Sequence, residues 1–186
     1  MRIRQCDYGR GGNSILLYSG TNSTRDLKTI KASNNQVKAS RIYKHHSSIV
    51  NDVQYHPLHK SLIGTVSDDL TLQILDVRKP ENDRSTMTAK GHTDAVNALA
   101  FNPASEFVLA TASADKTVRL WDLRNLKDSL HTLIGHSDTV TSLSWHPFEE
   151  AILASGSYDR RVIFWDLARV GEEQQPDDQE DGAPEL

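Results

Sequence analysis

The stretch "SADKTVRLWDLRNLKDSLHTLIGHSDTV", residues 113–140, decides the fold because its landmarks recur elsewhere in the chain. It runs through a Trp-Asp pair and later reaches a Gly-His pair. Three copies align without gaps between their landmarks. The same 29 residues separate His46 from Leu75, His92 from Trp121 and His136 from Trp165. The copies follow one another at intervals of 46 and 44 residues, so this is a repeat protein.

Each copy predicts short β-strands. In "TVRLWDL", residues 117–123, Val118 and Leu120 alternate with the residues between them, and "RVIFWDL" in the next copy does the same. This period of two is typical of strands. His-Pro or Asn-Pro pairs in every copy mark turns. Four short strands per copy at this spacing describe one blade of a β-propeller.

The Gly-His and Trp-Asp signatures at this period resemble those of the WD-repeat family. The resemblance implies an all-β WD-repeat β-propeller, with three recognisable blades of an expected seven. A propeller closes with about 4 to 8 blades, so we expect an incomplete ring and a partial chain. The expected segments are an unassigned basic stretch that fits a worn blade remnant (1–24), the end of a preceding blade (25–44), two WD repeats (45–90 and 91–134), an incomplete WD repeat (135–170) and an acidic insertion loop (171–186).

Each copy also brings a serine, a histidine and an aspartate into one register, a set that nucleophilic catalysis could use. A catalytic triad occurs once per site, whereas this set recurs and travels with a tryptophan. The family resemblance implies instead a buried network, in which the aspartate and the hydroxyl hold a histidine that reaches the tryptophan. The structural network is predicted to contain His92, Ser113, Asp115 and Trp121 in one copy, and His136, Ser157, Asp159 and Trp165 in the next. No catalytic residue is expected. In the first copy Leu75 replaces the tryptophan, so that network lacks one member.

Composition argues against several classes of protein. The net charge of −4 divides into +7 for residues 1–44, −4 for residues 45–170 and −7 for residues 171–186. The body has no strongly basic face of the kind that binds nucleic acid, and no apolar run approaches the roughly 20 residues of a membrane helix. Direct nucleic-acid binding and membrane association are therefore not expected.

Metals and cofactors are not expected either. Cys6 is the single cysteine, which favours a reducing compartment, and five of the eight histidines occupy repeat positions. The chain has neither a G-x-x-x-x-G-K-[ST] phosphate loop nor a G-x-G-x-x-G motif.

Three stretches narrow the resemblance: "HHSSIVNDVQYHPLHKSLIGTVSDDLTLQILDVR", "NPASEFVLATASADKTVRLWDLRNLK" and "GEEQQPDDQEDGAPEL". They are similar to the histone-binding WD-repeat subfamily, the retinoblastoma-associated and multicopy-suppressor type, and within it to fungal small subunits of type B histone acetyltransferases. In that subfamily the acidic loop clamps a helix of a core histone. The matching positions here are Asp177, Asp178 and Asp181, while Ala183 replaces a proline of the usual Pro-Pro pair. The alternative from composition alone is a solvated acidic loop.

A second surface follows from blade geometry, because the loops that enter the first strand of each blade gather on one face of the ring. Asn51, Asn97 and Thr141 occupy equivalent places there. The resemblance implies that this face is a docking site for basic histone or cofactor tails, as it is in the subfamily. Relatives often carry a glutamate at Asn51 and a phenylalanine at Thr141, so the match supports this tail site less well than the clamp.

The resemblance implies a non-catalytic histone-binding subunit that presents core histones to a type B histone acetyltransferase and related chromatin complexes. The expected partners are core histones, the catalytic acetyltransferase subunit and other chromatin-complex subunits, in the nucleus and the cytoplasm. The alternative is a generic WD-repeat scaffold for protein–protein interaction with no histone preference.

An open ring exposes apolar surface at its ends. We expect Val118, Leu120, Val162 and Phe164 to lie on open blade faces, and the isolated chain to be poorly soluble or oligomeric.

Overall fold

The computed structural model describes residues 15–17, 41–79 and 87–170. Within them the chain forms strands and one short 3-10 helix, Leu167–Arg169. The strands are β1 (Ile15–Leu17), β2 (Arg41–Tyr43), β3 (Val50–Tyr55), β4 (Leu62–Ser67), β5 (Thr71–Asp76), β6 (Met87–Lys90), β7 (Val96–Phe101), β8 (Val108–Ser113), β9 (Thr117–Asp122), β10 (His131–Ile134), β11 (Val140–Trp145), β12 (Ile152–Ser157) and β13 (Val162–Asp166). In this described part no helix is long and apolar enough to cross a membrane.

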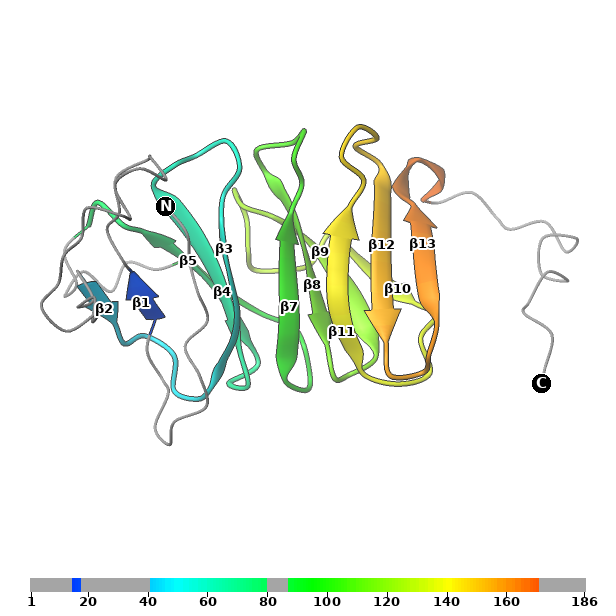
Figure 1. Cartoon of the computed structure of the whole chain (residues 1–186), viewed down its shortest axis with the longest axis horizontal. Helices are drawn as coiled ribbons and strands as arrows, with labels where there is room; N and C mark the ends of the chain where they lie inside the picture. Colours follow the sequence, from blue (N-terminus) through cyan, green and yellow to red (C-terminus); the bar gives the residue numbers. More distant parts are fainter. Residues whose placement is uncertain (1–14, 18–40, 80–86, 171–186) are drawn as a thin grey trace, which may run out of the picture.

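The strands form successive antiparallel sheets that stand side by side along the molecule (Figure 1). The first blade has the order β3-β4-β5-β6, the second runs from β7 to β10 in the same way, and the third contains β11-β12-β13 in its described part. The first strands of the blades are neighbours, with β3 beside β7 and β7 beside β11. The predicted all-β architecture of propeller blades is confirmed.

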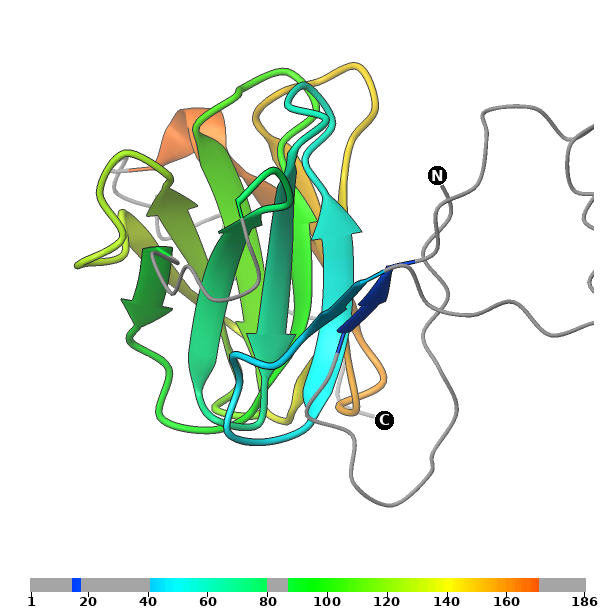
Figure 2. The ribbon, with the colours of Figure 1, turned by 90° about the vertical axis from the view of Figure 1, so that its left-hand side faces the viewer.

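A separate pair of strands lies beside the first blade (Figure 2), where β1 and β2 are antiparallel and Ile15 faces Tyr43. In the complete blades the last strand pairs with the third strand, as β6 does with β5. Like β6, β2 precedes a blade and pairs antiparallel with the strand before it in the chain. Tyr43 is buried against Ile63 and Leu75 of the first blade.

The turn between the second and third strands is the same in every blade. The N–H of Lys116 donates to the carbonyl of Ser113 over 3.2 Å, and Lys116 adopts a left-handed backbone with φ of 71°. Leu70 and Arg160 occupy the same place with φ of 66°. A turn followed by a left-handed residue is a common three-residue hairpin connection, and it fixes the register of the two strands.

The first two blades bury a continuous apolar interface. Leu72 and Ile74 of the first blade share one cluster with Leu99 and Phe101 of the second. Gly64 lies at a point of close approach, since a Cβ atom there would come within 2.8 Å of the Phe101 ring. A residue without a side chain therefore lets the two sheets meet at this point.

The interface between the second and third blades packs small residues against large ones. Val118 and Leu120, with alanines on the same face, pack against Trp145 and Leu153 of the third blade. The prediction that Val118 and Leu120 would be exposed is wrong, because the third blade covers them and leaves them 1% and 4% exposed.

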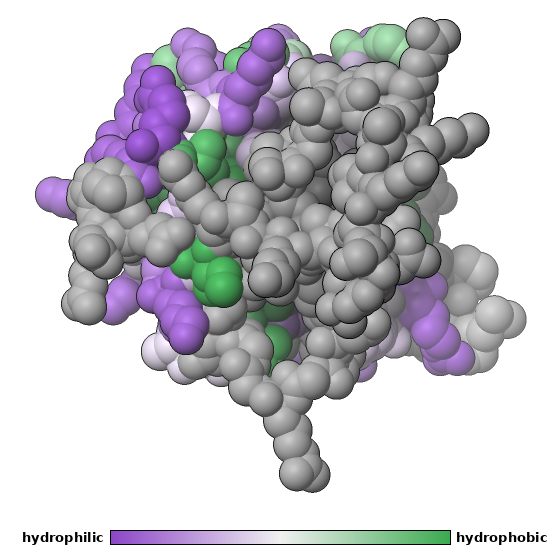
Figure 3. Space-filling model, turned by 60° about the vertical axis from the view of Figure 1, so that its left-hand side comes forward, coloured by the Kyte–Doolittle hydropathy of each residue, from purple (hydrophilic) through white to green (hydrophobic). Residues whose placement is uncertain are grey.

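The equivalent residues of the last strand have no such cover in the described part of the chain. Val162 is 65% exposed and Phe164 is 73% exposed. On the side shown in Figure 3, hydrophilic side chains of the described residues gather toward the rim and hydrophobic ones show in small patches between them.

Candidate functional site

The histidine network of the second blade is a chain of three short hydrogen bonds. The Trp121 indole N–H donates to the hydroxyl oxygen of Thr111 over 2.8 Å, and the same oxygen lies 2.8 Å from His92 Nε2. His92 Nδ1 lies 2.8 Å from a carboxylate oxygen of Asp115. The carboxylate can only accept, so Nδ1 carries the proton and Nε2 accepts the Thr111 hydroxyl proton. Every polar atom of this buried set has a partner, which fixes one packing arrangement.

The third blade repeats this geometry. His136 Nδ1 lies 2.7 Å from Asp159, His136 Nε2 lies 2.8 Å from the Ser155 hydroxyl, and the Trp165 indole donates to that hydroxyl over 2.8 Å. Histidine and tryptophan therefore meet at a shared hydroxyl oxygen rather than contacting one another by a hydrogen bond.

The hydroxyl in this position differs from the predicted one. The sequence assigns it to Ser113 and Ser157, but the structure places Thr111 and Ser155 there, two residues earlier on the same strands. Ser113 instead accepts the backbone N–H of Asp115 over 3.0 Å and holds the turn, and Ser157 does the same for its own turn. Residues two apart point to the same face of a strand, so the alternation leaves both hydroxyls as candidates.

Burial and hydrogen bonding set the charges of the network. Burial favours a raised pKa for Asp115, but hydrogen bonds from Thr117, from His92 and from the N–H of Thr93 outweigh it and hold the pKa at about 2. Burial lowers the pKa of His92, and the neighbouring Asp115 only partly offsets that effect. At neutral pH the pair is an ionised carboxylate and a neutral imidazole.

The residues predicted to face a basic tail also connect the blades. The Asn51 amide donates to the carbonyl of Val96 in the second blade over 2.9 Å, and the Asn97 amide donates to the carbonyl of Val140 in the third, also over 2.9 Å. The two side chains thus lie at equivalent sites, as their register predicts. The amide N–H groups of both form hydrogen bonds to the next blade.

The other predicted site residues do not form such bonds between blades in the described part of the chain. Thr141, at the corresponding position of the third blade, donates to the carbonyl of Gly156 in its own blade over 3.3 Å. Asp177, Asp178 and Asp181 of the predicted histone clamp lie outside the described residues.

At the opposite ends of the blades lies a second set of connections that the sequence analysis missed. His56 Nδ1 accepts the backbone N–H of His59 over 3.0 Å, so Nε2 carries the proton and donates to the carbonyl of Glu106 over 2.9 Å. Asn102 does the same with its amide, which donates to the carbonyl of Glu150 over 2.8 Å. The recurring His-Pro and Asn-Pro pairs are the signal in the sequence that could have shown this role.

Metal ligands do not gather in the described residues, where no three His, Cys, Asp or Glu side chains come together. The pair formed by His59 Nε2 and a Glu106 carboxylate oxygen, 3.2 Å apart, is an exposed contact between two blades.

Comparison with known proteins places these blades in a family. The family model described as "WD domain, G-beta repeat" matches residues 37–76, 83–122 and 127–166. Histone acetyltransferase type B subunit 2 of Aspergillus oryzae is 75% identical over 162 residues, which is 87% of this chain and 37% of that protein. The protein of the same name from Neurospora crassa is 76% identical over 162 residues, or 87% of this chain and 36% of its own length.

A more distant relative gives a similar result. Histone acetyltransferase type B subunit 2 of Schizosaccharomyces pombe is 64% identical over 144 residues, which is 77% of this chain and 34% of that protein. The chain spans a little over a third of the length of the first relatives it matches. The chain therefore belongs to the WD-repeat family, and over most of its length it is similar to subunit 2 of fungal type B histone acetyltransferases.

Proposed function

We propose that this chain is part of a histone-binding subunit that presents core histones to the catalytic subunit of a type B histone acetyltransferase. The observation that carries the proposal is the identity of 75% and 76% to relatives with that subunit's name, over 87% of the chain. We include other chromatin-complex subunits among its partners and the nucleus and cytoplasm as its locations.

Charge gives the proposed histone contact a physical basis. Residues 171–186 contain seven acids and no lysine or arginine, and Asp177, Asp178 and Asp181 lie in their midst. Carboxylates bind arginine through charge-assisted and often bidentate hydrogen bonds, so a dense acidic segment suits a basic histone helix. The blades then act as the scaffold that carries this segment.

We propose no catalytic role for the chain itself. The Thr111 hydroxyl beside His92 is fully buried and already bound by Trp121, whereas a nucleophile has to reach its substrate. The same set recurs in the third blade, which supports a role in packing.

The proposed tail face at Asn51, Asn97 and Thr141 has weaker support than the clamp. The Asn51 and Asn97 amides already donate to carbonyls of the next blade, so a tail that used them would have to displace these bonds. We therefore assign the main histone contact to the acidic segment.

Charge reversal tests the proposal. The triple variant Asp177→Lys, Asp178→Lys, Asp181→Lys is expected to weaken binding of a peptide of a core-histone helix by at least tenfold, measured by fluorescence anisotropy at fixed salt. The matched control makes the same net-charge change at exposed Asp128, Glu149 and Glu150 and should retain binding. Equal binding by both variants would instead favour a scaffold with no histone preference.

A further inference from the structure

Two positions of the first blade depart from the other blades together. His45 stands where the second and third blades have Gly91 and Gly135, and Leu75 stands where they have tryptophan. In the folded chain these two positions lie on the same network, because the histidine that follows each glycine is bound to the hydroxyl that receives the indole N–H.

The glycines are required by the tryptophans. A Cβ atom placed on Gly91 would lie 2.9 Å from the Cη2 atom of Trp121, and one placed on Gly135 would lie 2.9 Å from the Cη2 atom of Trp165. Such separations are shorter than carbon atoms tolerate, so an indole and a side chain exclude each other at this site. Leu75 is too short to reach that point, and this leaves space for a side chain at position 45.

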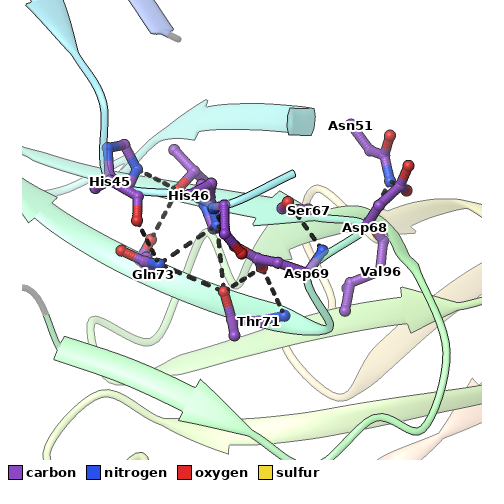
Figure 4. A network of polar contacts seen from close by, with 11 residues as sticks. His45, His46, Asn51, Ser67, Asp68, Asp69, Thr71, Gln73 and Val96 are labelled. Carbon is purple, nitrogen blue, oxygen red and sulfur yellow. Dashed lines mark hydrogen bonds and ion pairs between the residues drawn. The ribbon is translucent and has the colours of Figure 1, made fainter. Parts of the chain in front are cut away.

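The His45 side chain takes over the indole's hydrogen bond. His45 Nε2 lies 3.2 Å from the Thr65 hydroxyl oxygen, the atom equivalent to Thr111, and His46 Nε2 lies 2.8 Å from the same oxygen. His46 Nδ1 lies 2.9 Å from the Asp69 carboxylate, which can only accept. Figure 4 shows His45 and His46 converging on this network from one side.

These contacts determine which ring nitrogens of His45 and His46 carry a proton. His46 carries its proton on Nδ1 and accepts the Thr65 hydroxyl proton at Nε2. The Thr65 oxygen can then accept a hydrogen bond, and His45 Nε2–H donates it as the indole N–H does elsewhere. His45 Nδ1 is buried without a hydrogen-bond partner in the described part of the chain, as expected for a bare nitrogen.

We propose that His45 and Leu75 are a compensating pair, in which an imidazole supplies the volume and the N–H that a tryptophan supplies in the other blades. The exchange replaces a donor that never titrates with one that does. It therefore adds to the first blade an acid-sensitive donor that the tryptophan of the other two blades does not provide.

The direction of this sensitivity follows from the surroundings of His45. Burial, then the neighbouring His46, lower the pKa of His45 to about 4, and Asp69 opposes them. Among the described residues these two are the titratable groups that bear on His45. Between pH 6.5 and about 4 the unfolded chain binds a proton that the folded chain does not, so stability falls as the pH falls through this range.

A double-mutant cycle on the 186-residue chain tests the pair. His45→Gly removes the donor and leaves a void, and Leu75→Trp forces an indole against His45, so each alone should lower the urea midpoint of unfolding. The double variant His45→Gly/Leu75→Trp rebuilds the arrangement of the other blades and should recover most of the loss. A double variant as unstable as the sum of the single losses would overturn the proposal.

Two further measurements keep the test decisive if a single variant fails to fold. The double variant should lose less stability than the wild type between pH 6.5 and 4, and equal losses would contradict the titratable donor. Nitrogen-detected NMR of the histidines in the wild-type chain should show His45 protonated at Nε2 and bare at Nδ1. The opposite tautomer would exclude donation to Thr65.

Discussion

The indole nitrogen of Trp121 lies 2.8 Å from the Thr111 hydroxyl oxygen, deep between the first and second blades. The same oxygen lies 2.8 Å from His92 Nε2, so this hydroxyl joins the tryptophan to the histidine by hydrogen bonds. One buried oxygen thus satisfies two ring nitrogens, so its removal has a larger effect than the loss of one hydrogen bond.

Thr111→Val should therefore lower the free energy of unfolding by about 2 to 4 kcal/mol, because it leaves two buried groups unsatisfied while conserving shape. Chemical denaturation followed by tryptophan fluorescence measures the effect. Thr132→Val, at an exposed site of β10, is the control and should change stability little. A comparable loss in both variants would contradict the bridging role of the Thr111 hydroxyl.

Gly64→Ala should destabilise the chain by about 1 to 3 kcal/mol, the usual range for overpacking a core. The added methyl group would lie 2.8 Å from Phe101 Cζ and 3.0 Å from Leu99 Cδ1, so the second blade has to shift. Gly156→Ala is the matched control, since its nearest neighbour would be Ser142 Cβ at 3.7 Å. Thermal melting of both variants should separate the crowded interface from a general effect of alanine in a strand.

Acid should destabilise the network in two stages. The folded pKa of His92 is below the usual 6.5, so the unfolded chain gains a proton first and stability begins to fall below about pH 6.5. The folded pKa of Asp115 is about 2 against the ordinary 3.8, so its contribution is complete above about pH 5 and is lost as the pH falls toward 2.

Urea midpoints measured from pH 7 to pH 2 check this dependence. Asp115→Asn should lower the midpoint at pH 7 and flatten the acid limb, whereas Asp94→Asn, at an exposed turn, should leave the profile of the wild type. Identical profiles for Asp115→Asn and the wild type would show that this carboxylate does not set the acid response.

The exposed face of the third blade should make the isolated chain self-associate. Phe164 is 73% exposed on β13 beside Val162, and apolar sheet faces with open edges invite association. Phe164→Lys should reduce the mean mass in light scattering at rising concentration. Phe148→Lys removes a ring that is 90% exposed in a loop, and it should leave the mass unchanged. Monomeric wild-type chain at all concentrations would contradict the prediction.

Much of the fold follows from the spacing of a few residues. The fixed distance from His92 to Trp121 implies one hairpin geometry in every copy, and the alternation of Val118 and Leu120 predicts the strand that became β9. These are local properties, in which side-chain period and turn chemistry act within one blade. A single copy already shows these patterns, and their recurrence in three copies strengthens the prediction.

What the sequence could not predict depends on which segments meet in the folded chain, within a blade and between blades. Ser113 and Thr111 share one face of β8, and only the approach of His92 selects Thr111. Val118 is buried because the third blade covers it, although its equivalent Val162 is 65% exposed in the described chain. The role of Asn51 likewise depends on a carbonyl 45 residues away. Periodicity predicts to which face of a strand a side chain points. Which residue it then contacts depends on how the sheets assemble.

Four of the side-chain bonds between blades share one direction along the array. Asn51 and His56 donate from the first blade to the second, and Asn97 and Asn102 donate from the second to the third. In these four bonds the donor belongs to the earlier blade and the acceptor is main chain, which any residue supplies. Two other bonds run the opposite way: the Trp145 indole donates to the carbonyl of Ala100 in the earlier blade, and the N–H of Leu99 donates to the Asp52 carboxylate. At these four points the accepting blade can change its side chain without losing the hydrogen bond. Such an arrangement lets a gene grow by head-to-tail duplication, because each new unit is received by backbone atoms that mutation does not alter.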